Sequence, residues 1–299
     1  MTFKPLAAAL AASAFLVACG GSSPSAVDQA LSELPAEIHY VAMGDSYSSG
    51  HGTVAHPDMG QCSRTPYAYG PLWQQRHAPA SFAFVACQGA TTANVTTTPQ
   101  SAQGESAIQL TALNAQTNMV TITIGGNDVG FAEVSKKCAE SEILDTDTAS
   151  CMRRVMKIQE IVDGTQLLPD NTTFYAHLVR TYTAIREKVS PDARIFVLGY
   201  PQIYYLPPGL EAIGPQTRQQ IDAVMISMNS AIARAAAEVG VTYVDVQAQF
   251  AGHGAGKDNP NDQWINDISF TDTHISLHPN IDGHAKGDLP ALEAATARL

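Results

Sequence analysis

The sequence predicts an α/β fold in which a central parallel sheet of about five strands lies between two layers of helices, a three-layer α/β/α sandwich. Strand-like and helix-like segments alternate along the chain, which is typical of parallel pairing with both faces of the sheet covered. The 299 residues are 45% hydrophobic and 15% charged, enough apolar content for one large domain. We find no internal repeat.

The N-terminal segment is predicted to lie outside this domain. Lys4 precedes an apolar run from Leu6 to Val17. This run is too short to span a bilayer, which needs about 20 residues, and is typical of a signal peptide. It leads into Leu16-Val17-Ala18-Cys19-Gly20, which resembles the lipobox of bacterial lipoproteins. The resemblance implies that residues 1–18 are cleaved and that Cys19 carries a diacylglyceryl group, with residues 19–36 as a flexible tether.

We therefore expect an extracytoplasmic protein of the cell envelope, anchored to a membrane by its lipid. An ordinary signal peptide, giving a secreted protein, is the alternative if the lipobox is not used.

The predicted domain covers residues 37–299. Apolar and β-branched segments predict five strands, Ile38–Met43, Phe82–Ala86, Met119–Ile124, Arg194–Leu198 and Val241–Val246. Apolar residues at helical spacing predict helices at Pro66–Arg76, Ala107–Leu113, Leu167–Val189 after Asp170, Gln216–Val239 and the tail from Gly283, which Pro290 interrupts. Residues 133–165 are polar, and we expect them to form an insertion over the edge of the sheet.

Charge and cysteine content narrow the function further. Acidic residues outnumber basic ones 28 to 17, a net charge of −11 that argues against a nucleic-acid partner. With Cys19 assigned to the lipid, four cysteines remain, and export permits disulfides. The sequence allows three pairings, of which we favour Cys62–Cys87 with Cys138–Cys151, since each closes a modest loop. Neither pair has the short spacing of a zinc or redox site.

Small and polar residues follow the first three strands, at the end of the sheet where such folds bind ligands. Ser46 lies in GDSYSSG, Gly89 in CQGATT and Asn127 in GGND, and His278 follows in LHPN near the C-terminus. Ser, Gly, Asn and His in this order resemble the SGNH hydrolase superfamily, also called GDSL esterases and lipases. The segments are most similar to its secreted actinobacterial lipase/esterase branch, over residues 37–299.

The resemblance implies a flavodoxin-like SGNH fold and hydrolysis of carboxylic esters without a cofactor. It assigns Ser46 as nucleophile and His278 as base, with an oxyanion hole formed by Ser46 N–H, Gly89 N–H and the Asn127 side chain. A serine hydroxyl needs such a base, and donors aimed at the oxyanion stabilise the tetrahedral intermediate. The first two disulfides of that branch also match the pairings favoured above.

One position departs from the superfamily pattern. Most members have an Asp three residues before the histidine, where this chain has Ile275. In the branch that this chain resembles, a main-chain carbonyl can orient the imidazole instead, so we expect the Ile275 carbonyl to accept from His278 Nδ1 in a Ser–His dyad. Asp272 and Asp282 are the alternative partners.

Other interpretations of the site remain. His274, His278 and His284 suggest a metal site, but Pro279 breaks the helical spacing and no further ligand falls at a metal-site interval, so we expect none. Residues 258–262 resemble a calcium loop faintly and are more typical of a turn. Ser48 and Ser49 compete with Ser46 as nucleophile.

For the whole protein, we expect a monomer acting on an acyl or lipid ester. The alternatives are a non-catalytic ligand-binding surface lipoprotein and a carbohydrate deacetylase of the same superfamily.

Overall fold

The computed structural model describes residues 37–53, 60–131, 134, 137–138, 148–205, 214–269 and 275–297. The predicted signal peptide, Cys19 and the tether lie outside these residues. Residues from Ile38 onward form one unit, and the fold described below is that of this unit.

The centre of the domain is a five-stranded sheet in which every pairing is parallel. Its strands are β1 (His39–Gly44), β2 (Ser81–Phe84), β3 (Met119–Thr123), β4 (Arg194–Leu198) and β5 (Thr242–Val244). The predicted α/β class and the five predicted strands are confirmed. The spatial order is β2-β1-β3-β4-β5, the order of flavodoxin-like folds. The order of the strands reverses between β1 and β3, and crevices at such a point bind ligands in this class of sheet.

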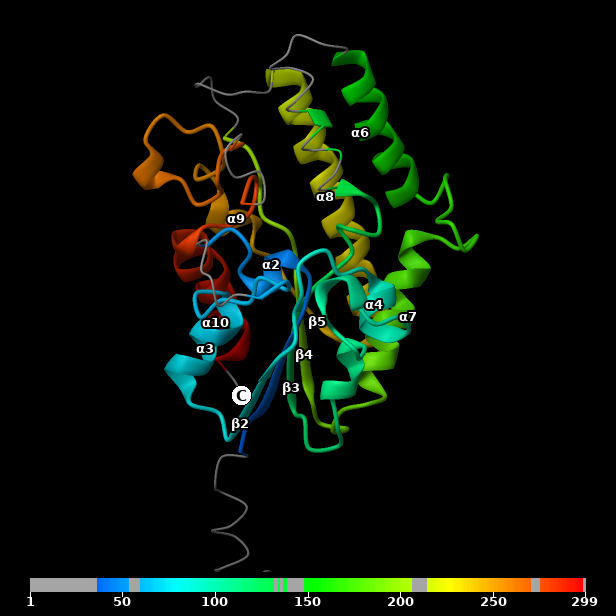
Figure 1. Ribbon diagram of the computed structural model, residues 1–299, viewed down its shortest axis with the longest axis vertical. Helices are drawn as coiled ribbons and strands as arrows, with labels where there is room; N and C mark the ends of the chain where they lie inside the picture. The colour runs from blue at the N-terminus through cyan, green and yellow to red at the C-terminus, as the bar shows by residue number, and fades with distance from the viewer. Residues whose placement is uncertain are drawn as a thin grey trace, which may run out of the picture. The chain divides into compact units, whose positions relative to one another are not determined.

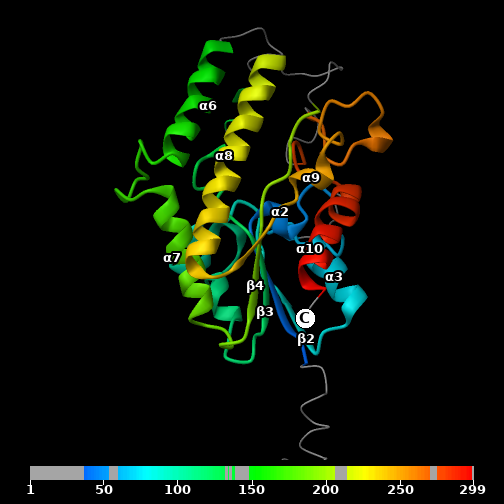
Figure 2. The same cartoon turned by 180° about the vertical axis from the view of Figure 1, so that it is seen from behind.

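Helices cover both faces of the sheet (Figures 1 and 2). On one face lie α3 (Tyr69–His77) and α10 (Leu289–Thr296), and on the other lie α4 (Thr92–Thr96), α7 (Phe174–Arg186) and α8 (Pro215–Val239). Helix α8 begins with Pro215 in its first turn and ends at Gly240 in the left-handed conformation, signals that typically start and stop a helix. Shorter elements are α2 (Ser46–Ser49), α9 (Gln247–Phe250) and η5 (Gly283–Asp288), a π-helical segment that continues into α10.

One predicted helix was wrong, and one helix was not predicted. The predicted helix at Ala107–Leu113 is only the 3₁₀ turn η3 (Gln109–Ala112). The polar stretch expected over the sheet edge contains α6 (Thr148–Val162), which packs against α8. Val155, Ile158 and Val162 are buried on α6, so an apolar stripe among charged residues gives α6 a face with which to pack.

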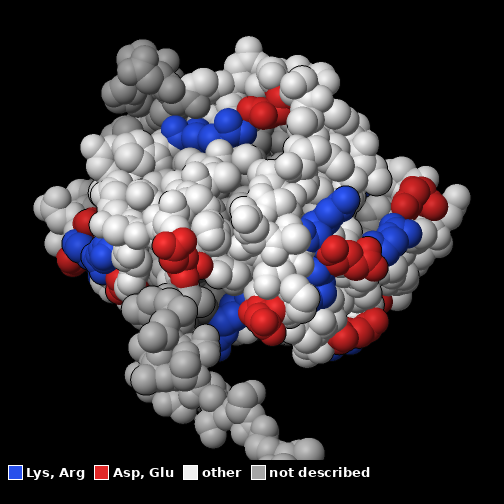
Figure 3. All heavy atoms as spheres, turned by 90° about the horizontal axis from the view of Figure 1, so that it is seen from below, with Lys and Arg blue, Asp and Glu red and all other residues white. Residues whose placement is uncertain are grey.

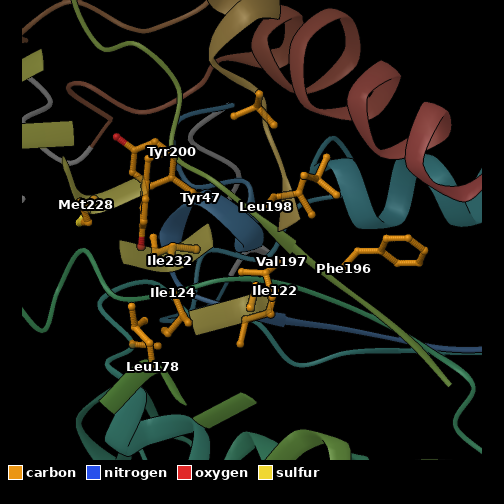
Figure 4. Close-up of a cluster of buried hydrophobic side chains, with 14 of the residues drawn as sticks. Tyr47, Ile122, Ile124, Leu178, Phe196, Val197, Leu198, Tyr200, Met228 and Ile232 are labelled. Carbon is orange, nitrogen blue, oxygen red and sulfur yellow. The ribbon is translucent and has the colours of Figure 1, made fainter. Parts of the chain in front are cut away.

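The core lies between the sheet and its two helical layers (Figure 4). Every residue of β3 is buried, and its β-branched side chains suit a strand covered on both sides. Ile122 and Ile124 lie near Leu178 of α7, while Met228 and Ile232 come from α8 (Figure 4). Tyr47 and Tyr200 lie at the end of this cluster, so the core extends to the carboxyl end of the strands.

The charged side chains do not form a basic surface on the face seen from below. There, Lys and Arg lie interspersed with Asp and Glu among larger uncharged areas (Figure 3). Among the described residues, none of the helices has the length and apolar content needed to cross a membrane.

Candidate active site

Ser46 lies at a tight turn between β1 and α2. Asp45 caps the helix, its Oδ1 accepting from the N–H of Tyr47 at 2.9 Å. Gly44, with φ of +122°, makes the turn possible, because a Cβ there would stand 2.3 Å from the carbonyl oxygen of Thr123. Gln109 holds Gly44 from the side, since its amide bonds both the N–H and the carbonyl of that glycine at 2.7 and 2.9 Å. The turn therefore presents Ser46 at the carboxyl end of the sheet.

His278 stands within hydrogen-bond distance of Ser46, although the two are 232 residues apart. The distance from His278 Nε2 to Ser46 Oγ is 2.9 Å. His278 Nδ1 lies 2.8 Å from the carbonyl oxygen of Ser276, which can only accept, so the neutral ring carries its proton on Nδ1. Nε2 is then the acceptor for the Ser46 hydroxyl.

The predicted acceptor for His278 was wrong by one residue. The carbonyl of Ile275 instead accepts from the backbone N–H of His278 at 3.3 Å and from Asn266 Nδ2 at 3.2 Å. Leu277 adopts the left-handed conformation, with φ of +59°, and so turns the chain just before His278. Two hydrogen bonds hold this residue, from its N–H to the Asn266 carbonyl and from Tyr47 Oη to its own carbonyl.

Neither of the two aspartates considered as alternative partners of His278 is seen to bond it in the part of the chain that the structure describes. Asp282 forms an ion pair with Lys286 at 2.9 Å. Asp272 and His274 lie outside the described residues.

Two aromatic rings pack against the His278 imidazole. The ring of His51 meets it edge-on at 4.7 Å, and the ring of Tyr47 lies at 5.1 Å. Burial and, to a smaller extent, the neighbouring His51 lower the pKa of His278 to about 3, against the hydrogen bond that the ring donates to the Ser276 carbonyl, which raises it. The resting imidazole is therefore neutral over the ordinary pH range and is able to accept a proton.

The three expected donors follow three neighbouring strands, β1, β2 and β3. The Ser46 N–H belongs to the first turn of α2, where N–H groups have no acceptor within the helix. Gly89 follows β2 with φ of +73°, and a Cβ there would meet no atom within 4 Å, so glycine is needed for the conformation and not for close packing. Asn127 follows β3, and one hydrogen of its amide donates to the carbonyl of Ala90 at 2.9 Å. This bond ties the Asn127 side chain to the Gly89 loop and leaves its second N–H for another acceptor.

A carboxylate braces the two loops that carry these donors. Asp128 accepts from the backbone N–H of Thr92 at 3.0 Å and from its hydroxyl at 2.5 Å, and so joins the end of β3 to the start of α4. Burial raises the pKa of Asp128, against the hydrogen bonds from Thr92 that lower it. The structure also pairs Cys62 with Cys87 and Cys138 with Cys151, as we favoured from the sequence. The first of these disulfides ends two residues before Gly89.

The rival serines have other partners. Ser48 Oγ lies 2.7 Å from Tyr69 Oη and accepts from the N–H of Thr123 at 2.9 Å. Ser49 Oγ lies 3.3 Å from the carbonyl of Ser46 and donates to it. Both hydroxyls help to hold the turn, whereas the hydroxyl of Ser46 meets an imidazole.

The residues suspected of binding metals have other surroundings. Within the described ranges, no three His, Cys, Asp or Glu side chains come together in a way that could hold a metal ion. His284 is fully buried, with its Nδ1 2.9 Å from Asp288 Oδ2. Residues 260–262 form a 3₁₀ turn capped by Asn259.

Several residues of the site were not found from the sequence. Gln109 belongs to no strand end or motif, while Tyr47 lies within GDSYSSG and His51 directly after it, where the pattern gives them no role. Asn266 holds the His278 loop through its amide, which donates to the carbonyls of Gly52 and His278 at 2.8 and 3.1 Å. These contacts join segments far apart in the chain, which sequence spacing does not reveal.

Comparison with known protein families agrees with this fold and with the motifs that contain Ser46, Gly89, Asn127 and His278. The GDSL-like lipase/acylhydrolase family matches residues 42–286, and the chain belongs to this family. The resemblance seen in the motifs is thereby confirmed, and the protein is a carboxylic ester hydrolase of the GDSL lipase and esterase group.

Individual relatives share most of the chain. The sequence is 33% identical over 284 residues to Lipase 1 of Streptomyces coelicolor, covering 95% of this chain and 96% of that protein. It is 37% identical over 260 residues to a lipase of Streptomyces rimosus, covering 86% of each. The crystal structure of phospholipase A1 from Streptomyces albidoflavus NA297 matches with a TM-score of 0.73 and 35% identity, covering 87% of this chain and 99% of that one.

Proposed function

We propose that the protein is a serine esterase or lipase that hydrolyses acyl or lipid esters through an acyl-enzyme on Ser46. The observation that carries this proposal is the contact of 2.9 Å between Ser46 Oγ and His278 Nε2, in an imidazole whose other nitrogen faces a carbonyl. A hydroxyl paired with a neutral imidazole has the arrangement of an activated nucleophile. A non-catalytic ligand-binding lipoprotein would not need it.

The reaction proceeds in two halves. His278 Nε2 takes the proton of Ser46 as Oγ attacks the ester carbonyl, and the carbonyl oxygen becomes an oxyanion. Ser46 N–H, Gly89 N–H and the free N–H of the Asn127 side chain stabilise this oxyanion. His278 then gives its proton to the leaving alkoxide, and water attacks the acyl-enzyme by the same route in reverse. The Ser276 carbonyl orients the imidazole but stabilises its protonated form less than a carboxylate would.

Hydrolysis of p-nitrophenyl acetate, butyrate and palmitate tests this function. We expect Ser46→Ala to abolish turnover of all esters that the wild type cleaves, while Ser101→Ala, at an exposed serine outside the site, retains full activity. Turnover that survives in Ser46→Ala, or a wild type that cleaves none of these esters, would overturn the proposal.

The substrate is proposed to be a lipid or long-chain acyl ester. The similarity to a phospholipase A1 and to proteins called lipases supports this choice. The alternative is a carbohydrate deacetylase, which would prefer acetate to palmitate. The chain-length profile of the same assay separates the two.

The location is proposed to be outside the cytoplasm, on a membrane through a lipidated Cys19. The lipobox-like sequence supports this, as does the similarity to a structure called an extracellular lipase of Streptomyces rimosus. Expression in a bacterium with labelled palmitate is expected to label the wild type and not Cys19→Ser. Release of an unlabelled wild-type protein into the medium would favour an ordinary signal peptide instead.

A further inference from the structure

Tyr200 links the turn that carries the nucleophile to the turn that carries Asn127. The side chain is buried at the carboxyl end of β4. Its hydroxyl accepts from the backbone N–H of Gly126 at 2.8 Å and donates to Asp45 Oδ2 in a short hydrogen bond. Asp45 directly precedes Ser46, and Gly126 directly precedes Asn127, so one oxygen atom bonds the neighbours of both.

The surroundings hold this hydroxyl in one position. The side chain of Asn229, in α8, bonds the N–H and the carbonyl of Tyr200, each at 2.8 Å. A Cβ on Gly126 would stand 3.1 Å from the Tyr200 hydroxyl oxygen, so the loop approaches the phenol closely. The second oxygen of Asp45 caps α2 through Tyr47 N–H. A shift of the phenol would therefore move the turn of Ser46 or the turn of Asn127.

The same tyrosine also reaches the histidine loop through packing. Its ring meets the ring of Tyr47 edge-on at 5.0 Å, and Figure 4 shows the two side chains next to each other. The Tyr47 hydroxyl donates to the carbonyl of Leu277 at 2.7 Å, one residue before His278. Tyr200 thus contacts, directly or through one neighbour, each of the segments that carry Ser46, Asn127 and His278.

We propose that Tyr200 is a positioning residue that keeps the nucleophile turn and the Asn127 turn in register, so that the oxyanion donors meet the ester that Ser46 attacks. This inference rests on the proposed function. The chain of donors runs from Gly126 N–H to Tyr200 O–H to the Asp45 carboxylate. Hydrogen bonds in such a chain strengthen one another, and the carboxylate at its end strengthens the bond that Tyr200 donates. Stabilisation of the transition state depends on the positions of the oxyanion donors to within a fraction of an ångström, whereas binding of the ground-state ester does not.

Tyr200→Phe removes the bridging oxygen and keeps the ring. With p-nitrophenyl butyrate, we expect a kcat about 10- to 100-fold lower and a KM within about threefold of the wild type. Affinity for an alkyl boronic acid, which forms a tetrahedral anion on the serine, is expected to fall by about the same factor as kcat/KM. Tyr182→Phe is the matched control, because Tyr182 is equally buried and its hydroxyl has no hydrogen-bond partner among the described residues.

A double-mutant cycle distinguishes a specific hydrogen-bond bridge between Tyr200 and Asp45 from a general loosening of the fold. If Tyr200 acts through Asp45, the double variant Tyr200→Phe with Asp45→Asn loses little more kcat than the worse single variant. Two independent defects would multiply instead, and that outcome would overturn the proposed bridge. A Tyr200→Phe enzyme with unchanged kcat would overturn the positioning role, and so would one that loses kcat only in proportion to its folded fraction. Whichever of these results is found, the proposed function still stands if Ser46→Ala loses turnover.

Discussion

Asn127 offers the sharpest test of the oxyanion hole, because one side-chain N–H donates to the Ala90 carbonyl at 2.9 Å and only the other is free. Removing one oxyanion donor costs about 3–4 kcal/mol of transition-state stabilisation, which equals roughly a 10²–10³-fold loss in kcat. Loss of the hydrogen bond to the Ala90 carbonyl should lower the free energy of unfolding of this variant by about 1 kcal/mol, so we expect it to stay folded. For Asn127→Ala, we therefore expect kcat for p-nitrophenyl butyrate to fall about 10²–10³-fold, with KM within about threefold.

The Asn127→Asp variant tests the same assignment by placing a negative charge beside the oxyanion. A carboxylate replaces the donor with an acceptor, facing the Ala90 carbonyl and the developing oxyanion. Two like charges about 4 Å apart repel by about 4 kcal/mol at an effective dielectric constant of 20, so the aspartate variant should be less active than the alanine one. Asn259→Ala, at an exposed asparagine that caps the turn Pro260–Asp262, is the control and should keep its activity. A kcat within threefold of the wild type for Asn127→Ala would refute the assignment.

Three further predictions concern the histidine, its candidate partner and the disulfides. The pKa of His278 lies below that of an unfolded histidine, so the unfolded chain binds a proton in the window from about 6.5 to 3 and stability is lost as pH falls through it. Urea unfolding should therefore show that His278→Gln gains roughly 2–3 kcal/mol relative to the wild type between pH 7 and pH 4, and an unchanged difference would contradict the shift. Asp282→Asn should retain most of the esterase activity, and a thousandfold loss would restore a carboxylate partner for the base. Cys62→Ser and Cys138→Ser should each cost about 3 kcal/mol of stability in thermal unfolding, from the loops that the bonds close. Only Cys62→Ser should also lower kcat, because its disulfide braces the Gly89 loop, and equal kcat losses in the two variants would argue against that brace.

Much of the fold followed from local patterns. All five strands were predictable because each is a short apolar run ending in glycine or polar residues, as at Arg194–Leu198, where prediction and structure coincide. Helix α6 was missed because its apolar stripe is spread among charged residues and gains its stability only by packing on α8. The turn η3 was taken for a helix because a short apolar stretch satisfies both patterns.

Site residues within recognisable motifs could be predicted from the sequence, whereas those that depend on contacts between residues far apart in the chain could not. Ser46 and His278 meet as their motifs implied, but the acceptor for the imidazole depends on the left-handed backbone of Leu277, which a leucine seldom adopts. Tyr200 lies 155 residues from Asp45, and the two residues meet only because β4 is separated from β1 by β3 alone. Such a pair leaves no trace in spacing or periodicity.

Because a carbonyl and not a carboxylate faces His278, the proposed catalysis depends more strongly on stabilisation of the oxyanion. A carboxylate would stabilise the imidazolium formed when Ser46 is deprotonated, whereas the Ser276 carbonyl supplies only a dipole. Burial works in the same direction, since it lowers the pKa of His278 to about 3 and so disfavours the protonated ring. The base is thus available at every ordinary pH but has a weak affinity for the proton that it must take. Stabilisation of the oxyanion must therefore offset much of this cost, which explains why we expect large losses of kcat at Asn127 and Tyr200 and almost none at Asp282.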